Sequence, residues 1–143
     1  MLAYWKALCR DRPMPRRQDV DPLDIWRLLR NVFLTEWHRA PDRLFYRIAG
    51  TELAAALGFE ISGKWLTQVY QDQVDIDRTL GLYRSVVESR KPVLGRTEGT
   101  KLRLGTDSFD WVICPLSDTG AEVTHFIGLE DYTASRPYLG FAD

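Results

Sequence analysis

The stretch of residues 45–65, FYRIAGTELAAALGFEISGKW, constrains the fold more than any other part of the chain. The segment that leads into it, residues 44–49, is rich in aromatic and apolar residues and is typical of a strand. Thr51 can then cap a short helix over residues 51–57, and Gly58 favours the left-handed conformation that commonly ends a helix. A strand, a turn and a short helix in so short a span predict a domain that mixes both kinds of element.

The rest of the chain supplies further elements in an informative order. The predicted elements are helices over residues 2–10 and 22–30, a hairpin of strands over 31–38 and 44–49, a helix over 51–57, a short mixed segment over 61–70, a longer helix over 76–90, and strands over 92–102, 108–116 and 122–132. This order predicts an α+β fold, in which a five-stranded antiparallel sheet carries the helical middle on one face and encloses a pocket.

Composition excludes several classes of function. The chain has 143 residues, 45% of them hydrophobic, and a formal net charge of -1, which suits a single globular domain and does not suit a nucleic-acid-binding protein. Its apolar runs are too short for a membrane span, and its first residues do not resemble a signal peptide, so we expect a cytoplasmic protein without a membrane partner. Cys9 and Cys114 fit no metal or redox spacing.

Six segments, taken together in their order and spacing along the chain, are typical of one known family. They are YW within MLAYWKAL, PMPRRQDVDP, FLTEW, YRIAGTELAAALGFEISGKWL, PVLGRTEG and WVICPLSDTG. Together they resemble a PAS domain of the compact bacterial sensory type with an N-terminal helical extension. The resemblance implies a five-stranded antiparallel sheet with helices on one face, and a role as a sensor or dimerisation module that in some members binds a small ligand. We therefore expect a helical extension over residues 1–30, a PAS-like domain over 31–133 and an irregular tail over 134–143.

The residues do not support the two coloured cofactors known in this family. Flavin-binding light sensors of this fold carry an Asn-Cys-Arg motif in the helical middle, where this chain has no cysteine, so a cysteinyl-flavin is excluded. Haem sensors need an axial histidine in or near the longer helix, and neither His38 nor His125 lies there. The sequence requires no cofactor, and an absorbance spectrum of the purified protein tests the remaining hypothesis of a haem or flavin sensor.

Side chains that face the helical middle would line any pocket. The set nominated by strand alternation and helical spacing is Tyr46, Ile48, Leu53, Leu57, Trp65, Leu66, Tyr83, Val87, Trp111, Ile113 and Phe126. The alternative is that these side chains fill the core and leave no space for a ligand.

For the charged and titratable residues, we expect structural roles before catalytic or ligand-binding ones. Arg47 lies between apolar neighbours in a strand, and we expect it to pair with a carboxylate such as Asp131 or Glu130, or else to bind an anionic ligand. Asp72, Asp75 and Asp77 precede or open the longer helix, where the helix dipole favours acids. His125 is expected to be structural, and two separated histidines do not make a zinc site. With no nucleophile and base in neighbouring motifs, no catalytic residue is predicted.

We therefore expect a non-enzymatic sensory or interaction module in bacterial signalling that binds a small apolar ligand. Its expected partners are a signalling protein and a second copy of the chain, because the stripe of Leu2, Trp5 and Leu8 predicts a homodimer through the N-terminal helix. The alternative is a small cone-shaped α+β enzyme or carrier for a hydrophobic molecule. A titratable cavity residue with a perturbed pKa would favour that alternative, and the early hairpin argues against it.

Overall fold

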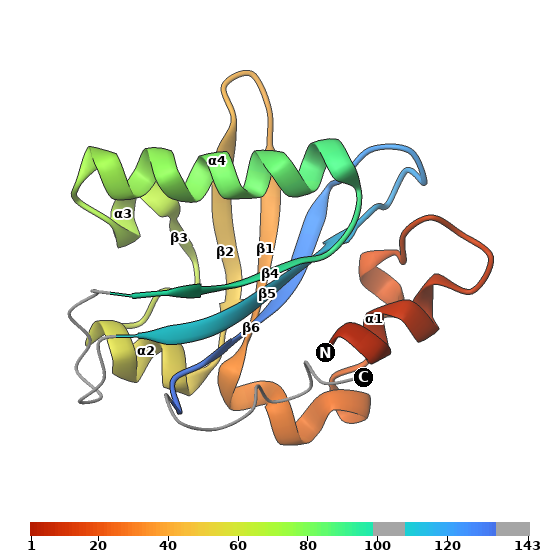
Figure 1. Ribbon diagram of the computed structural model, residues 1–143, viewed down its shortest axis with the longest axis horizontal. Helices are drawn as coiled ribbons and strands as arrows, with labels where there is room; N and C mark the ends of the chain where they lie inside the picture. Colours follow the sequence, from red (N-terminus) through yellow and green to blue (C-terminus); the bar gives the residue numbers. More distant parts are fainter. Residues whose placement is uncertain (99–107, 134–143) are drawn as a thin grey trace.

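The fold is built on one antiparallel sheet, whose strands follow the order β3-β2-β1-β6-β5-β4 in the computed structural model (Figure 1), which describes residues 1–98 and 108–133. The strands are β1 (Val32–His38), β2 (Arg43–Ala49), β3 (Lys64–Trp65), β4 (Val93–Thr97), β5 (Phe109–Leu116) and β6 (His125–Asp131). The predicted α+β architecture is confirmed. The sheet has a sixth strand, β3, which pairs two residues at the edge of β2 and is too short to leave a pattern in the sequence. The predicted tail over residues 134–143 lies outside the described residues.

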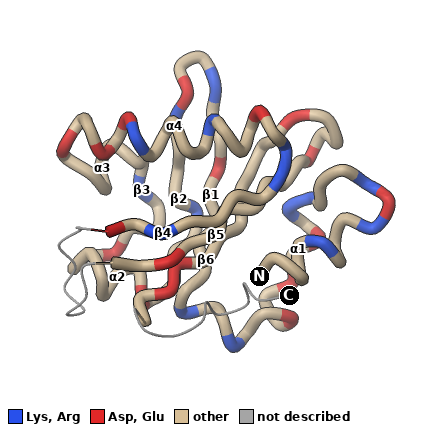
Figure 2. Tube along the Cα trace, in the orientation of Figure 1, with Lys and Arg blue, Asp and Glu red and all other residues tan. Residues whose placement is uncertain are grey.

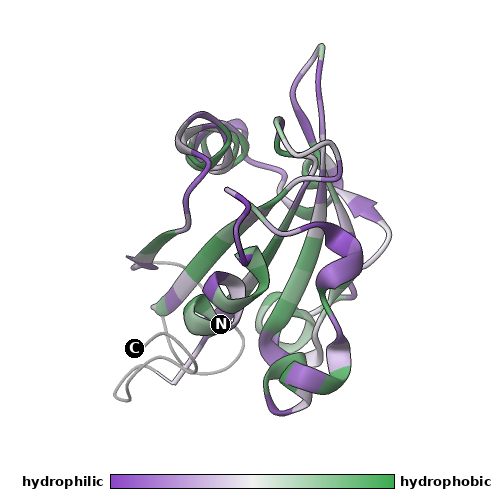
Figure 3. Cartoon of the chain, turned by 90° about the vertical axis from the view of Figure 1, so that its right-hand side faces the viewer, coloured by the Kyte–Doolittle hydropathy of each residue, from purple (hydrophilic) through white to green (hydrophobic). Residues whose placement is uncertain are grey.

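Helices cover both faces of this sheet. The long helix α4 (Gln73–Ser89) lies across one face, and α2 (Thr51–Leu57) and α3 (Leu66–Val69) lie on the side next to β3 (Figure 1). The opposite face carries α1 (Leu2–Cys9) and the 3-10 helix η2 (Pro22–Asn31), which follows a short turn of 3-10 helix, η1 (Arg17–Asp19). Figure 3 shows the apolar residues of the strands enclosed between these two layers.

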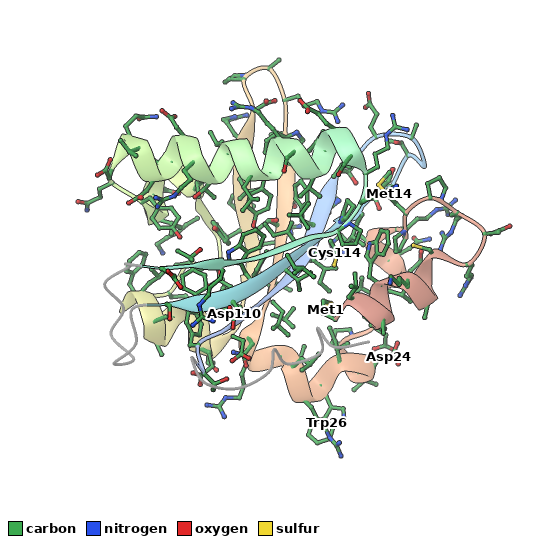
Figure 4. All side chains as sticks on the ribbon, viewed as in Figure 1. Met1, Met14, Asp24, Trp26, Asp110 and Cys114 are labelled. Carbon is green, nitrogen blue, oxygen red and sulfur yellow. The ribbon has the colours of Figure 1, made fainter. Side chains whose placement is uncertain are left out.

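Successive side chains of β5 and β6 alternate between two buried surfaces, one on each face of the sheet. The ring of Phe126 meets that of Tyr83 in α4 at a centroid distance of 4.8 Å, so Phe126 faces α4. Cys114 and its register partner Ile127 face the other way, toward the layer that contains α1 (Figure 4). There the Trp5 indole donates a hydrogen bond of 2.7 Å to the carbonyl of Pro115. The apolar stripe of the N-terminal helix is therefore partly covered by the sheet of its own chain.

Gly58 ends α2 at φ 86°, in the left-handed conformation, as predicted. The longer helix, predicted over residues 76–90, begins three residues earlier, at Gln73, where Asp72 caps it by accepting a hydrogen bond from Val74 N at 2.8 Å. Asp21 likewise caps η2, through Leu23 N at 2.9 Å. The prediction that Thr51 caps α2 is wrong, because Thr51 is the first residue of the helix, which spans the predicted residues 51–57, and Gly50 holds the cap position without a side chain.

Candidate functional site

A cavity lies between α4 and the β4–β5 side of the sheet. Its outer part, of about 620 Å³, is lined by Tyr70, Asp75, Arg78, Thr79, Leu82, Arg96, Thr97, Glu98, Phe109 and Trp111. Several of these residues also line an inner part of about 70 Å³, together with Phe33, Tyr46, Tyr83, Ile113 and Glu130. The shared walls make one depression that leads from the surface to the interior of the domain.

The inner wall is aromatic and contains one carboxyl group. Glu130 lies two residues beyond Gly128 and four beyond Phe126 in β6, so alternation turns its side chain toward α4. Its carboxylate accepts a hydrogen bond from the hydroxyl of Tyr132. Burial raises the pKa of Glu130 from its ordinary value of 4.5 to about 7, and the hydrogen bond from Tyr132 offsets only part of that effect.

Four tyrosines surround this carboxyl group from different elements. Tyr46 comes from β2, Tyr70 follows α3, Tyr83 comes from α4 and Tyr132 follows β6. Burial raises the pKa of all four phenols, and the charge of Glu130 raises it further, so they stay neutral at physiological pH.

A fully buried hydroxyl on the same face of the sheet adds to the polarity of this interior. Thr35 of β1 pairs in register with Tyr46 and with Phe126. Its Oγ1 has no hydrogen-bond partner within 3.5 Å among the described residues, although it lies close enough to Tyr83 to lower the pKa of that phenol slightly. An unpaired buried hydroxyl is costly, and Thr35 lies beside the inner cavity without lining it.

Charges at the mouth of the cavity are paired with one another. Arg78 forms an ion pair with Asp75 within α4. Arg96 of β4 lies 2.8 Å from Asp110 and 3.3 Å from Glu98. Figure 2 shows acidic and basic residues interspersed along α4. The mouth therefore carries little net charge in its described part, and the unpaired carboxyl group lies deeper.

Ten of the eleven residues nominated from the sequence divide into three groups. Those that line the cavity, including a small recess of about 20 Å³ under α2, are Tyr46, Leu53, Leu57, Tyr83, Trp111 and Ile113. Phe126 and Val87 pack in the core and line none of these spaces. Trp65 and Leu66 line a separate pocket of about 190 Å³, which meets α4 at Leu80, near the middle of that helix.

That separate pocket is the weaker candidate for a functional site. Its charged side chains are already engaged, because Asp42 accepts a hydrogen bond of 2.8 Å from Arg84 and Arg43 lies 4.6 Å from the centroid of the Trp65 ring. It contains no buried titratable group among the described residues. The cavity beside Glu130 offers both enclosure and a group whose protonation can change.

Ile48 does not lie with the other nominated residues. Its side chain is 54% exposed. The pairing of β1 with β2 shifts between Leu34 and Thr35, so that Leu34 opposes Ile48 while Thr35 opposes Tyr46. This bulge places two successive residues of β2, Arg47 and Ile48, away from the cavity, which simple alternation does not foresee.

Arg47 pairs with a carboxylate, but with neither of the two that were expected. Its Nε lies 3.2 Å from Oε1 of Glu36, which belongs to the neighbouring strand β1 and lies on the face of the sheet away from the cavity. Glu130 faces the cavity on the opposite side. An exposed pair of this kind contributes little to stability, and Arg47 does not face the interior as a binding site for an anion would require.

The other titratable residues considered in the sequence have structural positions. Asp72 caps α4, and Asp75 and Asp77 lie in its first turns, where Asp77 accepts a hydrogen bond from Gln73. His125 is half-buried and lies 2.9 Å from the hydroxyl of Thr124. Among the described residues, no group of three His, Cys, Asp or Glu side chains is placed to hold a metal ion.

Sequence reasoning missed several residues of the inner wall, of which Glu130, Tyr70, Phe109 and Tyr132 matter most. Alternation in β6 contained the signal for two of them, since Glu130 and Tyr132 continue the series that begins with Phe126. Tyr70 follows α3 in a segment without regular periodicity, so the sequence offers no pattern that would place it in the cavity.

Comparison with known proteins gives one informative result. A family model described as a PAS domain matches residues 1–130, and so includes the N-terminal helices as well as the sheet. No curated protein matches the chain. Separately, no helix in the described part of the chain is long and apolar enough to cross a membrane.

Proposed function

The chain belongs to the PAS domain family, and we propose that it is a non-enzymatic sensory module of bacterial cytoplasmic signalling that binds a small molecule between α4 and the sheet. The ligand has a mainly apolar body, as its aromatic surroundings require. A signalling protein reads the state of the domain, and a second copy of the chain is the other expected partner.

One observation carries this proposal: the cavity continues from the surface to the inner wall around Glu130. Its outer part alone, at about 620 Å³, lies in the size range of small-molecule sites. Apolar and aromatic side chains dominate the inner lining, and a few polar groups converge there, as is typical of sites that bind and orient a small ligand.

One observation supports the alternative of a small enzyme or carrier. The pKa of Glu130 is raised, and raised carboxyl pKa values are a feature of acid–base catalysts. The cone-shaped fold of that alternative does not agree with the family of the chain. Among the described residues of the inner lining, Glu130 is accompanied by no His, Cys, Lys, Ser or second carboxylate, so it lacks a nucleophile or partner base. Binding is the role that this set of residues supports best.

Native mass spectrometry of the protein purified from its own host tests the proposal. We expect a population that carries the mass of one small molecule, which is released when the protein is denatured. Detection of the bare protein alone, in preparations that keep the domain folded, would contradict a resident ligand. The absorbance spectrum of the same sample tests for haem or flavin.

A further inference from the structure

We propose that the inner cavity binds the positively charged amino or ammonium group of a small organic cation, with the Glu130 carboxylate as its counter-ion and the tyrosine rings as its cage. This inference rests on the proposed function, because it names the chemical class of the ligand for the same cavity. It adds a charged head group to a ligand whose body is apolar.

The first argument is that Glu130 has no cationic partner in the described part of the chain. Its carboxylate accepts a hydrogen bond from Tyr132, and its backbone carbonyl accepts one of 2.8 Å from the Asn31 amide. No ion pair of the described residues includes it. The Glu130 side chain is partly buried, and a carboxylate withdrawn from water is costly without an opposite charge, which a cationic ligand would supply.

The second argument is the kind of surface around this carboxylate. Rings from Tyr46, Tyr70, Tyr83, Phe109 and Trp111 line the inner cavity. The faces of aromatic rings attract cations, and such cages together with a carboxylate suit ammonium groups that carry apolar substituents. The inner part, at about 70 Å³, has room for a head group of a few heavy atoms, while the outer part accommodates the rest of the molecule.

Other ligand classes fit this site less well. An anion would face the Glu130 carboxylate, and the described arginines at the mouth are engaged, Arg78 by Asp75 and Arg96 by Asp110 and Glu98. A metal ion would find a single carboxylate among the described residues of the inner wall. A neutral ligand would leave Glu130 without a counter-ion. The organic cation is the class that satisfies both the rings and the charge.

The experiment compares two probes that differ in charge and little in shape, 2-phenylethylamine and 2-phenylethanol. Binding to the full chain is followed by NMR chemical-shift changes at pH 8, where Glu130 is ionised and the amine is protonated. We expect the amine to bind at least about tenfold more tightly than the alcohol, because a charge-assisted contact is stronger than a neutral one. Equal affinities, or tighter binding of the alcohol, would overturn the inference.

Two isosteric variants test whether the preference for the amine depends on the charge of Glu130. Glu130→Gln keeps the acceptor for Tyr132 and removes the charge, so we expect the amine to lose its advantage while the alcohol binds as before. Glu88→Gln removes the same charge from an exposed side chain of α4 that lines neither part of the cavity, and it serves as the matched control, with little change expected. Equal losses in both variants would mean that general electrostatic attraction, and not a site at Glu130, accounts for the preference.

A measurement on the unaltered protein keeps the inference testable if Glu130→Gln is unstable. The titratable groups that face Glu130 are Tyr46, Tyr70, Tyr83 and Tyr132, which remain neutral near pH 7, and the mouth charges of α4 form their own pair. Because Glu130 must ionise to pair with the amine, affinity for the amine should rise about tenfold between pH 6 and pH 8. The alcohol should show no such rise, and a rise shared by both probes would overturn the inference.

A third probe, phenylacetate, separates failure of this inference from failure of the proposed function. Binding of phenylacetate or the alcohol in preference to the amine would leave a ligand-binding cavity but reject the cationic ligand. If none of the three probes changes the signals of the residues that line the cavity, both the inference and the proposed binding function are contradicted.

Discussion

At the scale of single residues, Glu130 gives the cavity its distinctive chemistry. It lies among tyrosines that burial keeps neutral, so its own charge is the only one on the described inner wall that changes near neutral pH. Strand alternation alone is enough to place Glu130 and Tyr132 on the same side of the sheet as Phe126. The sequence analysis instead expected Arg47 to pair with Asp131 or Glu130, because sequence alone does not show that the bulge turns Arg47 away from the cavity and toward Glu36.

We predict that Glu130 makes the free protein less stable as pH rises. The unfolded carboxyl group loses its proton near pH 4.5 and the folded one near pH 7, so the folded state binds more protons between these values. The free energy of unfolding should therefore fall as pH increases from about 4.5 to about 7, by at most about 3 kcal/mol, and then level off. Urea denaturation across this range measures the effect.

Glu130→Gln isolates this contribution from those of other carboxyl groups. Asp19 and Glu60, whose pKa values are lowered mainly by backbone hydrogen bonds, affect stability in the opposite direction at lower pH and do so equally in both proteins. The difference in unfolding free energy between variant and wild type should grow in favour of the variant as pH rises to 7. Parallel pH profiles would show that Glu130 has no raised pKa.

At the scale of elements, local signals predicted most of the fold and long-range pairing produced the exceptions. Asp72, Gly58 and the hairpin turn act within a few residues, so their effects on α4, α2 and β1–β2 were visible in the sequence. The bulge that exposes Ile48 depends on how β1 meets β2, and β3 exists only because β2 offers a free edge. Such features depend on tertiary contacts that a local pattern does not contain.

Close packing between β1 and β6 makes Gly128 sensitive to substitution. A Cβ at Gly128 would lie 2.0 Å from Cζ of Phe33, whose ring lines the cavity, and 2.6 Å from the carbonyl oxygen of Val112. We expect Gly128→Ala to lower the free energy of unfolding by roughly 1–3 kcal/mol, as overpacking does.

Gly81→Ala is the matched control for this substitution. A Cβ at Gly81 in α4 meets nothing within 4 Å, and alanine favours the helix, so stability should rise by roughly 0.5–1 kcal/mol. Chemical denaturation of both variants makes the comparison. If Gly128→Ala were as stable as the wild type, the described packing of Phe33 against β6 would be incorrect.

At the scale of the whole molecule, the N-terminal helices close one face of the sheet and leave the other to the cavity. Met1 and Trp5 are buried against their own chain, so the inward side of α1 is not available to a partner. The outward side includes Ala3 and Ala7, which are exposed. The homodimer predicted from the sequence would therefore have to use this outward side.

Sedimentation of the full chain tests that prediction. We expect a dimer for the wild type and a monomer for Ala7→Glu, because a large charged side chain in place of Ala7 would be buried on association. Ala55→Glu, at an exposed position of α2, is the control and should remain dimeric. A monomeric wild type, or an Ala7→Glu variant that still forms dimers, would argue against a dimer through α1.

The most direct test of the central claim is native mass spectrometry of three proteins purified side by side from the same host. Thr79 lines both the outer and the inner cavity, whereas Ser85 is exposed on the same helix. We predict that the wild type and Ser85→Trp carry a small-molecule mass and that Thr79→Trp, whose new indole occupies the cavity, does not. An added mass on all three proteins, or on none of them, would contradict a ligand site between α4 and the sheet.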